Sequence, residues 1–319
     1  MFKYILIFII NLVLGITIYP YFIDFLKMKN YNQNVSEYAL EEYKQKAKTP
    51  IMGGVLFILL PVISVFLCSL FTDFSAKYYS VLLIYLAFGL VGFADDYIIL
   101  IKNDNAGLGA KTRLIAEALI VIVFYLLNLR HLDTSVTIPL FKAVIEIKHL
   151  YLFFILIMFL GEANACNFTD GMDGLCAGCS FISLIPLLIY SAMSRKFELV
   201  LIIMAVLGAL LAYLKYNRSP AKIFMGDSGS LALGALFSVL AVFLKVEIPL
   251  VIILFTFFIE IMSVIIQITS VKLFKRRVFA YTPIHYSFII KGKKEKDVVK
   301  MFYLFTTFFA FVGFLLIVI

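Results

Sequence analysis

The chain has 319 residues, of which 63% are hydrophobic and 15% are charged. Soluble globular domains carry about 25% charged residues, and the mean hydropathy of this chain is +1.03. These values exclude a soluble enzyme, a disordered chain and a nucleic-acid-binding domain with an exposed basic surface. In a membrane protein, Lys and Arg gather in cytoplasmic loops. The net charge of +8 therefore bears on the orientation of the chain in the membrane.

Apolar stretches follow one another along the whole chain. Since about 20 apolar residues span a bilayer, we predict an all-α polytopic membrane protein of about ten transmembrane helices, with residues 1–319 forming a single integral membrane domain. No small-residue cleavage pattern follows the first stretch, so we expect it to remain as an uncleaved helix. The predicted spans cover residues 3–25, 51–71, 78–94, 113–130, 150–163, 175–193, 199–216, 229–245, 249–270 and 299–319.

Ten spans place both termini on one side of the membrane and make the loops alternate. One set of loops carries 19 Lys and Arg residues, whereas the other set, together with the termini, carries eight. The positive-inside rule places the richer set in the cytoplasm and both termini outside. Among the outer loops only 131–149 is long, and its alternating pattern predicts a small external hairpin. The cytoplasmic set comprises 26–50, 95–113, 164–174, 215–222 and 271–297.

Five segments are unusually polar for a membrane protein, and all of them lie in the loops assigned to the cytoplasm. If such segments were scattered at random, half of them would lie outside. Their collection on one side supports the predicted topology and indicates one shared active-site cleft at the cytoplasmic face. The segments are 46–54, 93–97, 164–174, 217–230 and 282–285.

Carboxylates dominate these segments. Asp95 and Asp96 end a span and repel each other unless a cation lies near, although solvation of a helix end would also explain them. Asp170 and Asp173 share one helical face, and the glycines beside them allow a ligand to approach the backbone. Asp227 precedes the eighth span, where it is either a helix cap or a ligand for a hard cation such as Mg²⁺.

Other readings of the polar residues are weaker. The string 226–229 is similar to a serine-protease nucleophile loop, but His285 is the only evident triad partner, and no GxxxxGK phosphate loop is present. Three acids within apolar stretches either pair with other groups or line the cytoplasmic cavity; they are Glu117, Glu162 and Glu260. Four cations beside the carboxylates either serve the site or follow the positive-inside rule; they are Lys46, Lys111, Arg113 and Lys222.

Carboxylates, amides and cations at one membrane surface suggest a metal-bound diphosphate, and a site embedded in the membrane implies that the second reactant is a lipid. Phosphoryl transfer needs charge neutralisation and positioning more than covalent chemistry from the protein. The residues therefore favour a phosphoryl transferase acting between a diphosphate and a lipid.

The same segments resemble the polyprenyl-phosphate N-acetylhexosamine-1-phosphate transferases, from Lys46 to about Val299. The matching motifs are the Asp-Asp-Tyr of 95–97, the Asn and Asp repeat of 164–175, the Pro-Ala to Ser-Leu string of 220–231 and Thr-Pro-Ile-His at 282–285. The segment beginning at Thr49 and the Thr-Pro-Ile-His string favour the muramoyl-peptide branch over relatives that use UDP-N-acetylglucosamine.

The resemblance implies a Mg²⁺-dependent phosphoglycosyl transferase in a bacterial cytoplasmic membrane. In that family branch, undecaprenyl phosphate attacks the β-phosphate of UDP-N-acetylmuramoyl-pentapeptide, UMP leaves, and the first lipid-linked peptidoglycan precursor forms. The implied partners are these two substrates and the lipid bilayer, without nucleic acid, and a homodimer is compatible with the family.

The resemblance also implies roles for single residues. Asp227 would bind Mg²⁺, Asp95 would deprotonate or orient the lipid phosphate, and Asp96 and Lys111 would lie by the phosphates, which makes these four the catalytic set. Lys46 would lie near the ribose and diphosphate. The nucleoside pocket would be lined by Asn167, Asp170, Asp173, Asn217 and Phe224, and Gly226 and His285 complete the substrate-binding set.

The chain departs from the family pattern in places. His285 is followed by Tyr286 and Ser287 where the family has three consecutive His residues, and Ile51 and Ile99 stand where Thr and Lys are common. These departures keep open a sibling enzyme that transfers N-acetylhexosamine-1-phosphate from a simpler UDP-sugar. A secondary transporter is a further alternative, disfavoured because the acids gather at one surface and no repeat is evident.

Overall fold

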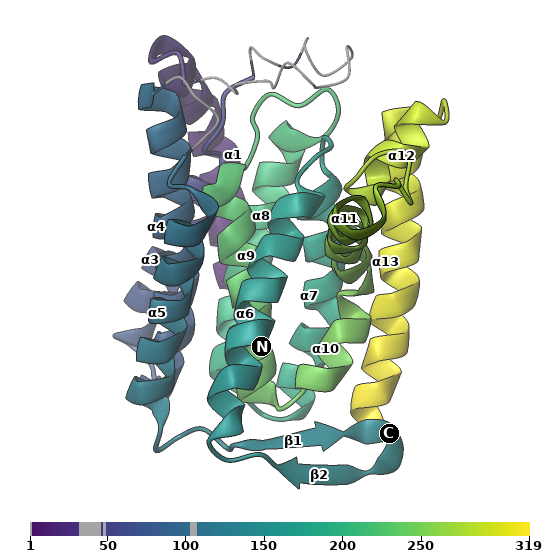
Figure 1. Cartoon of the computed structure of the whole chain (residues 1–319). Coiled ribbons are helices and arrows are strands. Elements are labelled where there is room, and N and C mark those ends of the chain that lie inside the picture. The colour runs from purple at the N-terminus through teal and green to yellow at the C-terminus, as the bar shows by residue number, and fades with distance from the viewer. Residues whose placement is uncertain (1, 32–45, 47–48, 103–106) are drawn as a thin grey trace.

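The computed structural model describes residues 2–31, 46, 49–102 and 107–319, which form a bundle of long helices with one short hairpin (Figure 1). Within these residues, eight helices are long and apolar enough to cross a membrane. The helices are α1 (Phe2–Met28), α3 (Gly54–Ser69), α4 (Tyr79–Lys102), α5 (Ala110–Asn128), α6 (Leu150–Thr169), α7 (Leu175–Met193), α8 (Phe197–Asn217), α9 (Gly226–Leu244), α10 (Glu247–Ile253), α11 (Phe255–Phe274), α12 (Ile284–Ile290) and α13 (Glu295–Val318).

The expected all-α polytopic membrane fold is confirmed, and each predicted span contains a helix. Helix α3 has 16 residues and is apolar but short, and α5 carries Lys111, Arg113 and Glu117 in its first half. Both run alongside the longer helices (Figure 1). The number of ten membrane crossings stays a prediction.

The two ends of the bundle differ in content. Both chain termini and the hairpin lie at one end, and the loops that carry the polar segments lie at the other (Figure 1). The hairpin pairs β1 (Ser135–Ile138) with β2 (Ala143–Glu146) in antiparallel register, with the 3-10 turn η3 (Pro139–Phe141) between them. A second 3-10 turn, η2 (Ala76–Tyr78), precedes α4. The hairpin expected in the long loop is thus present.

Helix α9 forms the centre of the bundle. It packs against α3, α4 and α6, and small residues let these helices come close. A Cβ added to Gly54 would collide with the backbone of Gly229, and one added to Gly92 would collide with the backbone of Asp227. These contacts place the beginning of α9 against the start of α3 and the second half of α4.

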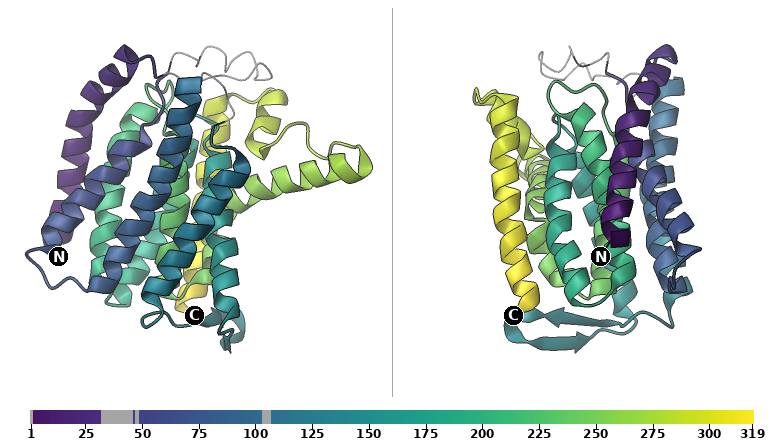
Figure 2. Two further views of the ribbon diagram at one scale, coloured as in Figure 1. Left: turned by 60° about the vertical axis from the view of Figure 1, so that its left-hand side comes forward. Right: turned by 180° about the vertical axis from the view of Figure 1, so that it is seen from behind.

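The apolar stretch 249–270 is not one continuous helix. It divides at Leu254, whose ψ of 23° ends α10 and precedes α11. Helix α11 then leans away from the bundle (Figure 2), and its last residue, Phe274, is 69% exposed. The sequence at the break is Ile-Leu-Phe, which contains no Gly or Pro, so hydropathy carried no sign of the bend.

Candidate active site

Asp96 fixes where helix α9 begins. Its carboxylate is 3% exposed and accepts hydrogen bonds from the backbone N–H groups of Asp227, at 3.0 Å, and Ser228, at 3.1 Å. Gly226 precedes them with a φ of 72°, and a Cβ at Gly226 would collide with the Asp96 carboxylate. The first N–H groups of a helix have no partner within it and favour negative charge. Asp96 therefore caps α9 from outside and positions Asp227.

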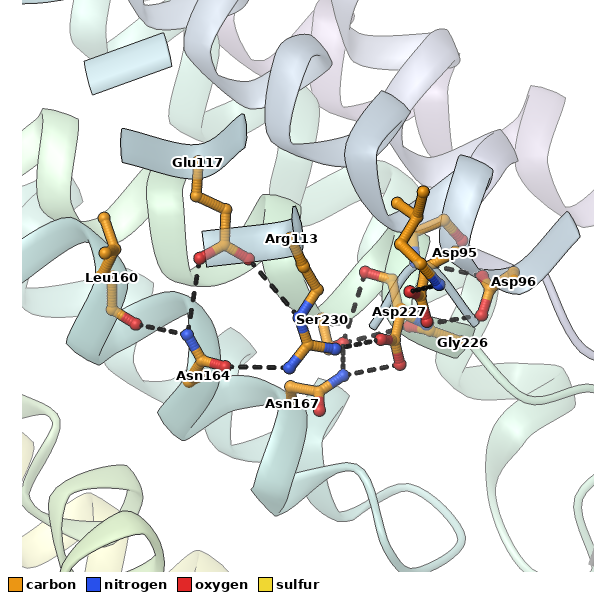
Figure 3. A network of polar contacts seen from close by, with 12 residues as sticks. Asp95, Asp96, Arg113, Glu117, Leu160, Asn164, Asn167, Gly226, Asp227 and Ser230 are labelled. Atoms are coloured by element: carbon orange, nitrogen blue, oxygen red, sulfur yellow. Dashed lines mark hydrogen bonds and ion pairs between the residues drawn. The ribbon is translucent and has the colours of Figure 1, made fainter. Parts of the chain in front are cut away.

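Asp227 carries the other contacts of this corner. Arg113 donates from Nη1 to its Oδ2 at 2.6 Å, and Asn167 donates from Nδ2 to its Oδ1 at 2.7 Å. Asp95 lies beside it (Figure 3) and accepts the N–H of Leu108 at 2.8 Å. Two neighbouring carboxylates attract a cation, and Arg113 supplies the positive charge seen here.

Arg113 is held on several sides. Its Nη2 donates to Asn164 Oδ1 at 3.0 Å, and its Nε lies 3.8 Å from Oε1 of Glu117, one helical turn further along α5 (Figure 3). Lys111, the cation expected at the phosphates, is exposed at the start of the same helix. Arg113, Asn164 and Glu117 were left out of the predicted site. The spacing of four residues between Arg113 and Glu117 is the signal that could have indicated their pairing.

A second cluster surrounds the loop between α6 and α7, residues 170–174, called the acidic loop below. Lys46 contacts Asp173 at 2.6 Å and Glu295 at 2.7 Å. Asp173 also accepts the N–H of Ala221 at 3.0 Å through Oδ2. The Phe224 ring lies 6.0 Å from Lys46 Nζ. The structure thus brings Lys46, Asp173 and Phe224 together, and it adds Glu295, the first residue of α13, which stands among basic residues in the sequence and gave no signal.

Asp170 begins the acidic loop and is half-buried. Its removal from water raises the pKa of its carboxyl to about 8, and the charges of Asp227 and Asp173 act in the same direction. The backbone N–H of Gly226 acts in the opposite direction and lowers this pKa.

Asn217 and His285 lie behind the surface of the site. Asn217 is 1% exposed; its amide accepts the N–H of Gly174 at 3.0 Å and donates to the carbonyl of Ile223 at 2.9 Å. His285 is fully buried, with Nδ1 3.1 Å from Oε2 of Glu260. A Cβ at Gly171 would collide with its ring. Both side chains contact the acidic loop: Asn217 accepts a hydrogen bond from the N–H of Gly174, and the His285 ring packs against Gly171.

The arrangement is compatible with Mg²⁺. Within the described part of the chain, no three His, Cys, Asp or Glu side chains form a group that could hold a metal. Magnesium commonly takes one or two carboxylates and completes its octahedron with water and substrate phosphates. Asp227, the expected ligand, lies beside Asp95, and the two carboxylates would suit such an ion.

Comparison with known proteins agrees with the geometry. A profile described as glycosyl transferase family 4 matches residues 78–245. The chain is 37% identical over 299 residues to a phospho-N-acetylmuramoyl-pentapeptide-transferase of Staphylococcus epidermidis, covering 92% of this chain and 93% of that protein. Proteins of the same name from Staphylococcus aureus strain Newman and Staphylococcus carnosus strain TM300 are 38% and 36% identical, with at least 92% of each chain covered.

Proposed function

The chain belongs to glycosyl transferase family 4, and on this premise we propose that it transfers phospho-N-acetylmuramoyl-pentapeptide from its UDP conjugate to undecaprenyl phosphate. UMP is released, and the product is the first lipid-linked peptidoglycan precursor. The observation that carries the proposal is similarity over 92% of the chain to enzymes of that name. The cluster around Asp227 lies within residues 78–245, which the family profile matches, and both clusters supply charges suited to a diphosphate.

Mg²⁺ is proposed as the cofactor, with Asp227 as its ligand and Asp95 beside it. Bound there, the ion would neutralise the diphosphate and make the β-phosphorus easier to attack. Arg113 would help Asp227 in this role, because its Nη1 lies 2.6 Å from Asp227 Oδ2 and holds the carboxylate in one orientation. Asp96 does the same through the backbone of α9.

Asp95 is proposed to orient the phosphate of the lipid substrate and to take its remaining proton. A phosphate monoester has a second pKa of about 6, so most of its charge is present at neutral pH and orientation is the larger task. Asp95 is held by the N–H of Leu108 and lies beside Asp227, which supports this role.

The nucleoside end of the donor is proposed to bind between the acidic loop and Phe224. Phe224 is half-buried and offers a face on which uracil can stack, while Lys46 lies beside it and offers positive charge to the diphosphate. Asp173 and Glu295 hold Lys46 in place.

The site end of the bundle is proposed to face the cytoplasm of a bacterium, with the hairpin and both termini outside. Support comes from the excess of Lys and Arg in the loops of the site end. A reporter fused to the C-terminus should give an external signal, and a cytoplasmic signal would overturn this orientation. The mass of the purified protein in detergent tests the expected homodimer.

The direct test is release of UMP by the purified protein with undecaprenyl phosphate and Mg²⁺. We expect release with UDP-N-acetylmuramoyl-pentapeptide, loss of release with EDTA, and recovery when Mg²⁺ is restored. The chain has Tyr286 and Ser287 after His285, which favours a second candidate donor, UDP-N-acetylglucosamine. Release with that donor alone would select the sibling enzyme, and release with neither donor would refute both readings.

A further inference from the structure

The backbone of the acidic loop is held by side chains from the C-terminal part of the molecule. The hydroxyl of Tyr286, on α12, donates to the carbonyl of Gly171 at 3.0 Å. The hydroxyl of Tyr303, on α13, donates to the carbonyl of Gly174 at 2.7 Å. Glu295, at the start of α13, accepts the N–H of Asp173 at 2.8 Å. Three side chains that come from beyond residue 280 therefore fasten a loop that lies more than 100 residues earlier.

Glycines make room for both tyrosines. A Cβ at Gly171 would lie 2.8 Å from the Tyr286 hydroxyl, and a Cβ at Gly178 would collide with the hydroxyl and ring of Tyr303. Atoms at such separations cannot coexist without a shift. The close approach of the tyrosines thus depends on the glycines in and just after the acidic loop.

The two fastenings differ in what else holds the loop nearby. The carbonyl of Gly171 follows Asp170, the carboxyl nearest to Asp227 within the loop. At the other end, Gly174 is also held through its N–H by Asn217. Loss of the Tyr286 hydroxyl should therefore displace the loop more than loss of the Tyr303 hydroxyl.

We propose that Tyr286 and Tyr303 are positioning residues that set the acidic loop for the nucleoside end of the donor. The inference rests on the proposed function. It assigns a task to Tyr286, which stands where the family has a histidine. Each hydroxyl acts through the loop carbonyl that accepts its hydrogen bond.

Three tyrosine-to-phenylalanine variants test the proposal, because each removes one hydroxyl and keeps the ring. They are Tyr286→Phe, Tyr303→Phe and the control Tyr216→Phe, whose hydroxyl donates to the carbonyl of Ile16 at 2.8 Å, away from the loop. The measurements are UMP affinity by calorimetry, donor KM and kcat, and melting temperature.

For Tyr286→Phe we expect about tenfold weaker UMP binding and a donor KM raised by about the same factor, because a carbonyl loses its partner. The value of kcat should change less than about twofold, since the contacts of Asp227 with Arg113 and Asn167 are untouched. Tyr303→Phe should show about a threefold effect. Tyr216→Phe should lower the melting temperature and leave KM and UMP affinity at wild-type values.

Wild-type KM and UMP affinity in both loop variants would overturn the positioning role, as would an equal rise of KM in Tyr216→Phe. A fall in kcat with unchanged KM would overturn it too, because it would place the hydroxyls in the chemical step. If the wild-type protein neither binds UMP nor releases it from any donor, the proposed function fails, and that result is distinct from a failure seen only in the variants.

Discussion

The two ends of the bundle each hold a cluster of charged residues, and the clusters are built differently. At the hairpin end, Lys245 donates to the carbonyls of Asp133 and Ser135 and to Oε1 of Glu247, 2.9 Å away. The Tyr151 hydroxyl donates to the same oxygen of Glu247 at 2.7 Å. Lys245 and Glu247 thus balance each other, and Glu247 is 1% exposed.

At the site end, acids exceed bases. Asp227 interacts with both Asp95 and Asp170, and Arg113 is the cation that contacts Asp227. Loss of one partner from a buried ion pair is strongly destabilising, because it leaves the other charge buried alone. A surplus of carboxylates, in contrast, leaves capacity for a cation from outside. We therefore expect substitutions in the hairpin cluster to change stability and substitutions in the site cluster to change binding and turnover.

The largest effect is expected for Asp227→Asn. If Asp227 holds Mg²⁺ as proposed, removing its negative charge should weaken binding of the ion and lower UMP release by about a thousandfold or more, since a catalytic metal ion supplies several kcal/mol to a transition state. The matched control is Glu247→Gln at the hairpin end, which should keep kcat and lower the melting temperature. Near-normal turnover in Asp227→Asn would contradict the view that the charges at the site end act in binding and turnover, unlike those at the hairpin end.

Gly226→Ala should follow in size. The residue has a φ of 72°, and its Cβ would collide with the carboxylate of Asp96. The start of α9 must then move, and we expect kcat to fall about a hundredfold, as displacements of about 1 Å do.

Gly292→Ala provides the control, because Gly292 has a φ of 85° and open space around its Cβ position. It should cost about 1–2 kcal/mol of backbone strain and leave kcat unchanged. Equal kcat values in the two alanine variants would show that the Asp96 contact does not position Asp227.

Lys245→Met should act on stability alone. It leaves Glu247 buried without its cation, which should lower the free energy of unfolding by about 3 kcal/mol, while KM and kcat stay at wild-type values. Thermal unfolding in detergent and the UMP assay measure the two quantities. Lys142→Met, at an exposed residue of the hairpin turn, should change neither; a lowered kcat in Lys245→Met would contradict the purely structural role.

The smallest effect is a pH dependence that comes from Asp170. Its pKa is raised from 3.8 to about 8, so between these values the folded protein keeps a proton that the unfolded chain releases. Stability from this group therefore falls as the pH rises from 4 to 8. Asp170→Asn removes this dependence. The melting temperature of the variant should therefore rise relative to that of the wild type as the pH increases from 5 to 8. If the melting temperatures of the two proteins change with pH in parallel, the raised pKa is refuted.

Composition and motif spacing predicted the membrane helices, the hairpin and the gathering of Asp95, Asp170 and Asp227. These features follow from local rules, because hydropathy marks a span and the positive-inside rule assigns a loop to one side. The hairpin could be read from its own alternation. The polar segments were recognisable because polar residues in a membrane chain are scarce.

Other features depend on contacts between distant parts of the chain. The role of Asp96 as the cap of α9 requires α4 and α9 to touch, although 131 residues separate Asp96 from Asp227. The choice between Lys111 and Arg113 depends on which face of α5 turns inward. The Asn217 side chain forms hydrogen bonds with backbone groups of two loops. The bend at Leu254 arises in a uniformly apolar sequence.

The central place of α9 has a consequence for how this protein can vary. In their most apolar stretches, 94% of the residues of α9 are buried but only 17% of those of α11. Lipid accepts almost any apolar side chain, whereas a packed neighbour accepts only a given volume. Substitutions should therefore accumulate quickly in α11 and slowly in α9, where Gly229 and Gly234 touch other helices. Keeping Asp227 in its position therefore requires that the residues packed around α9 keep their sizes, as well as that Asp227 keeps its charge.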